Sequence, residues 1–174
     1  MLFRSVATWE VTAYRTEIDD LIATVEVAPF IFEPQNVDEA RIQGVEVGVD
    51  AAWDDWQASL NADFKDPEDR ETGNQLPRRA KHNFRGSLTR SLGHWSLGTD
   101  VTVQGERFDD AANTIRLDSY ALIDLRASWR FAPDWRASLK VSNAGDADYE
   151  LVDTFETDGR SLLVQVDWRP GQRE

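Results

Sequence analysis

Apolar and polar residues alternate along most of this chain, and this period of two constrains the fold more than any other feature of the sequence. Successive side chains of a β-strand point to opposite faces, so the alternation predicts strands with one apolar and one polar face. The pattern is clearest over residues 56–65, 95–104, 118–130, 135–141 and 162–168, and it is present with slips of phase over 6–22, 37–53 and 80–91. We therefore predict a single all-β domain of about eight antiparallel strands, without a helix.

One slip of phase lies between Ile42 and Val45, where the apolar face of the strand changes parity. Two explanations fit this slip. A β-bulge near Gly44 would insert one extra residue into the strand, or the strand has left the buried zone at this point. The sequence leaves both explanations open.

The connections between the predicted strands alternate in length. Tight turns are predicted at residues 53–56, 91–94 and 131–134, and long connections at 23–36, 66–79, 107–118 and 144–159. In an up-and-down meander every second connection lies at the same end of the sheet, so the short turns share one end and the long loops share the other. Transmembrane β-barrels have this asymmetry, with short periplasmic turns and long extracellular loops.

Aromatic residues gather at two levels along the predicted strands. Strand parity assigns all seven tryptophans to the end with the short turns: Trp9, Trp53, Trp56, Trp95, Trp129, Trp135 and Trp168. A second set falls toward the long loops: Tyr14, Phe64, Phe84, Phe108 and Tyr120. The two sets are roughly 8 to 13 residues apart along a strand, close to the 9 to 11 or so that a tilted strand needs to cross hydrocarbon. We interpret them as two membrane girdles flanking an apolar band, so this face is predicted to contact outer-membrane lipid.

The alternative is a soluble β-barrel or sandwich, in which the same apolar face points inward. Alternation alone does not distinguish the two, because it does not say which face is outside. A soluble core would scatter its large aromatic rings through the interior, whereas here Ala, Val and Leu occupy the middle of the apolar face and the rings lie at its ends. This distribution favours the membrane barrel.

Composition excludes several functions. The 19 Lys and Arg against 32 Asp and Glu give a formal net charge of −13, which argues against nucleic acid as a partner because phosphates need clustered cations. Cysteine is absent, which excludes disulfides and thiolate metal sites. His82 and His94 lack the spacing of a metal pair, the acidic segment 146–158 fits a solvated loop, and no phosphate-loop or nucleophile-elbow motif occurs. We predict no enzyme activity, no catalytic residue, no cofactor and no metal site.

Membrane helices and leader sequences are also not indicated. No stretch approaches the run of about 20 apolar residues that a membrane-spanning helix needs. Residues 1–10 lack an apolar segment followed by a cleavage site, so for an exported protein we expect the true N-terminus to lie upstream.

Several segments resemble a known family. Residues 14–22 (YRTEIDDLI) and 36–46 (NVDEARIQGVE) are similar to paired strand motifs of TonB-dependent outer-membrane receptors. Residues 141–150 (VSNAGDADYE) resemble the family's N-L-F-D-x-x-Y-E segment, and Gly159-Arg160 with the alternation to Trp168 resembles its last strand. Residues 76–81 (LPRRAK) look most like the vitamin B12 (cobalamin) receptor branch.

The resemblance implies that residues 1–174 are the C-terminal part of a receptor β-barrel in the outer membrane, without the plug domain and the earlier strands. Such a receptor takes up a large scarce ligand, cobalamin-like or a siderophore, through its extracellular loops, and it engages the TonB complex through the missing N-terminal region. Two alternatives remain: a self-contained eight-stranded barrel with a structural or adhesion role, and a soluble β-barrel binding module. The eight strands could close into a small barrel or remain an open curved sheet.

Overall fold

The computed structural model describes residues 5–28 and 31–170, and its regular structure consists of β-strands. In chain order these are β1 (Val6–Ala28), β2 (Ile31–Trp53), β3 (Trp56–Asp69), β4 (His82–Leu92), β5 (Trp95–Gln104), β6 (Arg107–Phe108), β7 (Arg116–Leu117), β8 (Tyr120–Ala132), β9 (Trp135–Ser142) and β10 (Ser161–Trp168). Among the described residues, no helix has the length and apolar character needed to cross a membrane.

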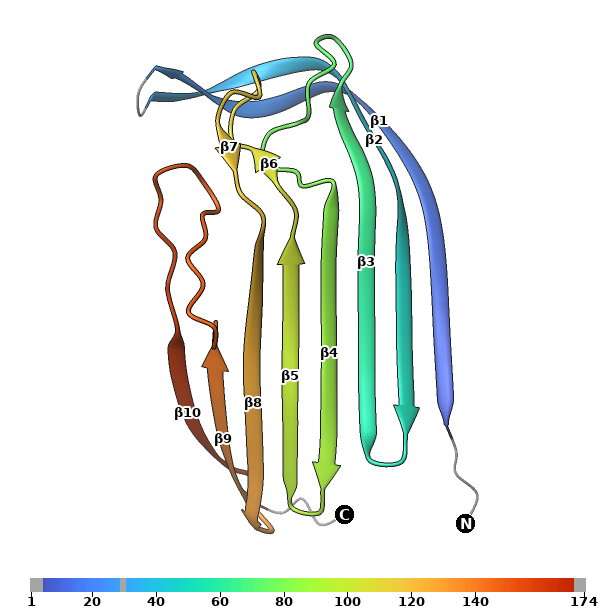
Figure 1. The fold of residues 1–174 in the computed structure, drawn as a ribbon, viewed down its shortest axis with the longest axis vertical. Coiled ribbons are helices and arrows are strands. Elements are labelled where there is room, and N and C mark those ends of the chain that lie inside the picture. Colours follow the sequence, from blue (N-terminus) through green and yellow to red (C-terminus); the bar gives the residue numbers. More distant parts are fainter. Residues whose placement is uncertain (1–4, 29–30, 171–174) are drawn as a thin grey trace.

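Eight of the strands form one antiparallel sheet in the order β1-β2-β3-β4-β5-β8-β9-β10, and β6 pairs with β7 in a separate short hairpin (Figure 1). Every strand of the large sheet pairs with its neighbours along the chain. The predicted all-β, up-and-down architecture is therefore confirmed. Of the two predicted outcomes for the eight strands, the structure has the open sheet, because in the described residues β1 and β10 each pair with one strand only.

The short turns lie at one end of the sheet and the long loops at the other, as predicted (Figure 1). Two of the turns need a left-handed backbone: Asp54 has φ of 46° and Gly93 has φ of 59°. Glycine and aspartate tolerate this conformation better than β-branched residues, which is why these residues mark the turns in the sequence.

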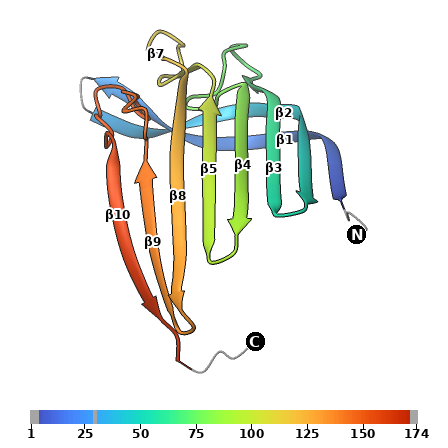
Figure 2. The same ribbon diagram turned by 60° about the horizontal axis from the view of Figure 1, so that its bottom comes forward.

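The predicted connection at 23–36 is instead a continuation of the β1–β2 hairpin, with pairing that extends to Ala28↔Ile31. The far half of this hairpin runs across the loop end of the sheet, from the β1 edge toward the β10 edge (Figures 1 and 2). Pro34 pairs with Thr24 inside this hairpin, because both strands of a two-stranded ribbon are edges, where proline is tolerated. The β-branched residues of this segment favour extended structure.

The register gives the main part of the sheet two chemically different faces. Val101 lies beside Ile123 on one face, and Asp100 lies beside Asp124 on the other. Ion pairs stabilise the polar face: Arg126 Nε lies 2.6 Å from an Asp100 carboxylate oxygen, and Lys140 Nζ lies 2.9 Å from an Asp124 carboxylate oxygen. The apolar face remains open, with 45% of Ile123 and 66% of Val164 exposed.

Fully buried apolar side chains occur at the loop end of the sheet instead. Leu76 from the β3–β4 loop packs with Ala40, Ile18 and Ile42, which have the parity of the polar face. The register of β2 runs through Gly44 without a shift, so there is no bulge at this position. The slip of parity at Ile42–Val45 therefore marks the level at which a loop covers the polar side of the strand, which makes apolar residues favourable there.

Gly44 lies at a close approach between neighbouring strands. A Cβ atom at this position would lie 2.5 Å from the Phe64 carbonyl oxygen and 2.9 Å from the Tyr14 hydroxyl. We expect Gly44→Ala to lower the free energy of unfolding by about 1–3 kcal/mol, because the backbone must shift to relieve the overlap. Urea unfolding of the purified protein, followed by tryptophan fluorescence, measures this loss.

Gly48→Ala is the matched control on the same strand and face. A Cβ there would meet the Asn61 side chain at 3.6 Å, which is an ordinary contact. We expect no loss of stability for this variant, since alanine reduces the freedom of the unfolded chain. Equal losses for the two variants would contradict the close approach at Gly44.

Candidate functional site

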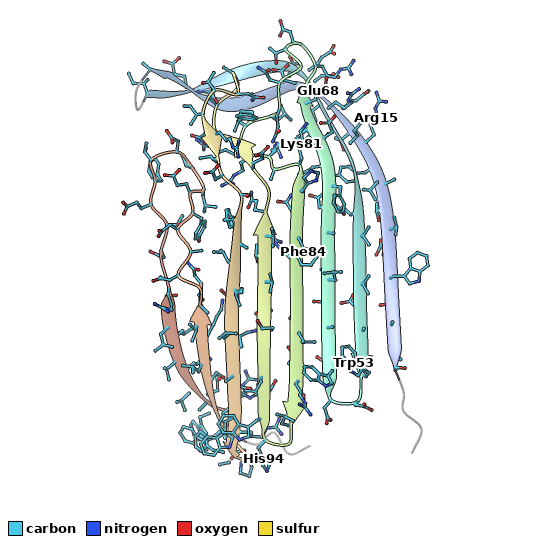
Figure 3. All side chains as sticks on the ribbon, viewed as in Figure 1. Arg15, Trp53, Glu68, Lys81, Phe84 and His94 are labelled. Carbon is cyan, nitrogen blue, oxygen red and sulfur yellow. The ribbon has the colours of Figure 1, made fainter. Side chains whose placement is uncertain are left out.

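All seven tryptophans lie on the apolar face of the sheet. Trp53 pairs with Trp56, Trp95 with Trp129, and Trp135 with Trp168, in each case near the short turns. The ring centroids of these pairs are 6.2, 5.3 and 6.0 Å apart, and Phe131 lies between Trp129 and Trp135. We call this set the aromatic row: Trp53, Trp56, Trp95, Trp129, Phe131, Trp135 and Trp168. Figure 3 places Trp53 beside the β2–β3 turn.

Trp9 lies on the same face but higher on its strand. Trp9 pairs with Val49 on β2, and the same register row continues across the sheet to Ile123 on β8. On β8, Trp129 lies six residues from Ile123 toward the short turns. From β1 to β8 there are five steps between neighbouring strands. The indole of Trp129 is therefore displaced from that of Trp9 by about 20 Å along the strands and about 24 Å across the sheet. A level line through the tryptophans crosses the strands obliquely, at about 40° to the hydrogen-bonding direction, which matches the tilt of about 35–45° in transmembrane barrels.

The second predicted aromatic set is divided between the two faces. Phe64 and Phe84 lie on the apolar face with the tryptophans. Tyr14 and Tyr120 lie on the polar face, where their hydroxyls donate hydrogen bonds to Asp63 (3.3 Å) and Gln104 (2.7 Å). Phe108 lies in β6, outside the large sheet.

Strand parity already separated these residues. Position 120 has the parity of Asp124 and Arg126, so the sequence contained the information that Tyr120 belongs to the polar face. Parity, and not aromatic type, therefore decides which face such a residue occupies.

The apolar face has a clear boundary at its loop end. Arg15, Gln43 and Asp66 are register partners across β1, β2 and β3. On β4 the boundary residue is His82, which pairs with Phe64 of β3. Asp66 lies ten residues from Trp56 along β3. This length is about that of a tilted strand crossing a hydrocarbon layer.

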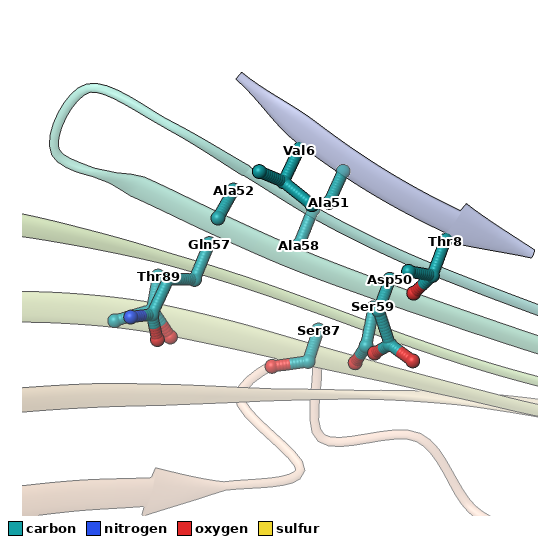
Figure 4. Close-up of a pocket in the computed structure, with 10 residues that line it drawn as sticks. All are labelled: Val6, Thr8, Asp50, Ala51, Ala52, Gln57, Ala58, Ser59, Ser87 and Thr89. Atoms are coloured by element: carbon teal, nitrogen blue, oxygen red, sulfur yellow. The ribbon is translucent and has the colours of Figure 1, made fainter. Parts of the chain in front are cut away.

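The polar face carries acids on its first strands and mainly cations on its later strands. Acids without a cation on β1 and β2 are Glu10, Glu46 and Asp50, and cations on β4 to β9 are Arg85, Arg126, Arg130, Arg136 and Lys140. A groove of about 580 Å³ runs from the acidic part of the polar face to its cationic part and is lined by Glu10, Glu46, Asp63 and Arg85. A second hollow lies nearer the turns, where the Asp50, Ser59 and Ser87 side chains point to the same side (Figure 4).

Two of the long loops are joined by reciprocal hydrogen bonds. The Gln75 backbone N–H donates to the Asn113 side-chain oxygen at 2.8 Å, and the Asn113 side-chain nitrogen donates to the Gln75 backbone carbonyl at 2.9 Å. The Asn74 side chain donates to the Ala111 carbonyl at 2.9 Å. The β3–β4 loop and the β6–β7 hairpin therefore form one connected surface.

Buried charged residues connect this surface to the β9–β10 loop. Asp109, which is 7% exposed, accepts from Arg78 Nε at 2.5 Å and from the Asp153 amide at 3.3 Å. Arg107, which is 2% exposed, donates to the Glu150 carbonyl at 2.5 Å and lies over the Tyr120 ring. We call Arg78, Arg107 and Asp109 the loop hub. No periodic pattern relates these three positions, so the sequence alone does not predict the hub.

Asp110 next to the hub organises its own hairpin. Burial acts to raise the pKa of this carboxyl group, but hydrogen bonds from the Ile115 amide, the Thr114 hydroxyl and the Thr114 amide outweigh burial, so the pKa lies below its ordinary value. The carboxylate form is thus the one that the folded hairpin stabilises.

The carboxylates of the acidic segment 146–158 are not gathered into a cation site. Asp146 accepts from the Arg160 amide at 2.8 Å and pairs with the Arg160 guanidinium. Within residues 5–28 and 31–170, no group of three or more His, Asp or Glu side chains is arranged to hold a metal ion.

The loop hub predicts that three loops loosen together. Asp109→Asn removes the charge of a buried carboxylate that accepts hydrogen bonds from Arg78 and from the Asp153 amide, and both bonds weaken when that charge is lost. We expect amide hydrogen exchange to accelerate at least about tenfold in all three segments 70–81, 105–119 and 143–160. Hydrogen-exchange mass spectrometry of peptides from these segments measures the effect.

Asp118→Asn is the matched control, because its carboxylate is 88% exposed and pairs with Arg116 in the same loop. Exposed pairs contribute little, so exchange should remain as in the parent protein. Acceleration confined to 105–119 in Asp109→Asn would contradict the loop hub.

Comparisons with known proteins agree with this geometry. The family model for the TonB dependent receptor-like beta-barrel matches residues 2–144. The chain is 32% identical over 165 residues to the vitamin B12 transporter BtuB of Photobacterium profundum and 27% identical to that of Vibrio vulnificus. Each of these matches covers 92% of this chain and 27% of the relative, so the chain spans about a quarter of their length.

Solved structures share the fold at lower identity. The siderophore receptor PiuA from Acinetobacter baumannii superposes with a TM-score of 0.77 at 21% identity, over 93% of this chain and 26% of the receptor. The copper transporter OprC superposes with a TM-score of 0.76 at 20% identity, over 93% of this chain and 29% of that structure.

Proposed function

The chain belongs to the family of TonB-dependent receptor β-barrels of the outer membrane, and on this premise we propose that it forms part of the wall of a receptor that takes up a large scarce ligand. The observation that carries the proposal is the exposed apolar face, which ends at the aromatic row toward the short turns and at Arg15, Gln43 and Asp66 toward the long loops. Lipid covers this face, and the polar face lines the interior.

This assignment of faces agrees with the energetics of the exposed residues. Leaving Ile123 at 45% and Leu125 at 47% exposure to water is unfavourable by roughly 25 cal/mol for each Å² of apolar surface. A soluble binding module would cover these side chains with a second layer, and no described element packs on them. Hydrocarbon removes the same surface from water without a second layer.

We propose that residues 1–174 are the C-terminal part of the barrel and that the plug and the earlier strands belong to other parts of the receptor. The free edges of β1 and β10 support this arrangement, because unpaired edges at membrane depth are costly until another strand satisfies their backbone groups. In this proposal the TonB complex acts through the N-terminal region and not through these strands.

We propose a cobalamin-like ligand first and a siderophore second. The identity to two vitamin B12 transporters supports this order, and so does the segment 76–81. In that segment Leu76 is buried and Arg78 pairs with Asp109, so these two residues shape the loops. We expect the ligand to meet the outer surface of the joined loops, above the loop hub.

Uptake tests the proposed function. A chimera of the Photobacterium profundum transporter, with its homologous segment replaced by this chain, should restore uptake of labelled cobalamin to cells that lack their own transporter. The uptake should disappear in cells without TonB. Normal import by a receptor from which these eight strands have been deleted would contradict the proposal, and a chimera that inserts but imports only a ferric siderophore would replace the first ligand by the second.

The oblique level of the tryptophans predicts the depth of individual residues. Val11 on β1 and Ala121 on β8 share a register row, but a tilt of about 40° places Val11 level with Ala127 and places Ala121 about 15 Å nearer the loop end. This chain has no cysteine, so single nitroxide labels at these positions are specific in a chimera from whose remaining part any cysteines have been replaced. Accessibility to oxygen and to a water-soluble nickel complex reports the depth of each label.

A label at Leu122, on the polar face, is the control and should contact the nickel complex freely. Equal depths for Val11 and Ala121 would mean that the strands stand upright, contrary to the proposed tilt.

A further inference from the structure

We propose that Arg90, stacked on Trp56, binds the phosphate of a phospholipid headgroup at the turn-end boundary of the apolar face. The inference rests on the proposed function in one respect, namely that lipid covers this face. It adds a specific anion site that a general apolar contact does not include.

Arg90 is a charged residue that lies on the apolar face. Its register partners are Trp56 on β3 and Leu97 on β5, so it belongs to the apolar face. Among the described residues of this face, from the aromatic row up to Phe64 and Phe84, no other side chain is charged. Every other charge of the strands at these levels lies on the polar face.

The depth of Arg90 makes a charge tolerable. An arginine on the lipid face costs about 2–4 kcal/mol at the middle of the bilayer and about 0–1 kcal/mol near an interface. Trp56 beside Arg90 belongs to the aromatic row, and tryptophans mark the interface. The long aliphatic part of Arg90 lies along apolar surface while its guanidinium extends to the headgroup level.

The stacking leaves the guanidinium edge free. The Arg90 Cζ atom lies 5.0 Å from the centroid of the Trp56 ring, which is a cation–π distance. In the proposed site the flat side of the guanidinium faces the ring, which leaves its N–H groups directed outward in the guanidinium plane. No carboxylate in the described residues forms an ion pair with Arg90.

The chemistry of these groups selects a phosphate. A guanidinium presents a planar fork of donors that matches two phosphate oxygens, and an aromatic surface beside it fixes the orientation of that fork. A phospholipid supplies this anion at the level of the tryptophans, together with acyl chains that cover Ala58 and Leu88 on the neighbouring register row. The same molecule thus satisfies the charge and the apolar surface.

The test uses the chimeric receptor described above, purified in detergent and titrated with phosphatidylglycerol, with native mass spectrometry counting the bound lipids. We expect Arg90→Gln to weaken the tightest lipid-binding step about tenfold, because a charge-assisted hydrogen-bonded pair is lost. Arg90→Lys should weaken binding less, since it keeps the charge but loses the fork and the stacking. Trp56→Leu should weaken binding while the charge remains.

Arg130→Gln is the matched control. Arg130 is also exposed and near the short turns, but its neighbours Trp129 and Phe131 lie on the apolar face, so Arg130 lies on the polar face. The Arg130→Gln variant removes the same charge as Arg90→Gln and should leave lipid binding unchanged. Inorganic phosphate at the same concentration should not compete, because it lacks the acyl chains.

Three results would overturn the proposal: unchanged lipid binding in Arg90→Gln, an equal loss in Arg130→Gln, or displacement of the lipid by inorganic phosphate. Failure of the proposed function is distinguishable from these results. A chimera that does not insert into membranes would remove the premise, whereas one that inserts and transports but binds lipid equally with and without Arg90 would remove this site alone.

Discussion

The antiparallel register across the large sheet is the constraint on which the other features depend. A slip of one residue would move every side chain of a strand to the opposite face. The aromatic row and the polar-face ion pairs both require the same register. Trp95 stacks on Trp129 only where Asp100 lies beside Asp124 and within reach of Arg126. Packing on one face and ion pairing on the other therefore specify one alignment together.

The loop end follows a different rule, because its loops cover the polar side of the strands. There the packing of Leu76 on Ala40 and the buried charges of the loop hub replace the alternation that governs the rest of the sheet. The buried carboxylate of Asp109 and the buried guanidinium of Arg107 each form hydrogen bonds with another loop, and because buried polar groups need such partners they specify one arrangement of the loops. A surface held in this way presents a preformed shape to whatever it binds.

The sequence predicted the features that repeat and missed those that depend on contacts between distant residues. The strand expected at 118–130 is β8 (Tyr120–Ala132), since alternation is a local property of the chain. The β1–β2 extension was not predicted. Pro34 is tolerated inside it because both strands of a two-stranded ribbon are edges, and the local sequence does not show that the segment forms such a ribbon. The pairing of Arg78 with Asp109 joins positions 31 residues apart, and no local pattern encodes it.

The distribution of charge reconciles an acidic chain with a lipid-facing surface. The formal charge of −13 would oppose membrane binding if it were spread over both faces of the sheet. Instead the acids of the strands lie on the polar face, as Glu46, Asp50 and Asp63 illustrate, or on the parts of the strands beyond the apolar band, as Asp66 does. The apolar face keeps one charge, the cation of Arg90, at the level where indoles already border water. Burying this face in hydrocarbon therefore requires no acid to lose its hydration, and the desolvation cost falls on one guanidinium that retains access to the interface.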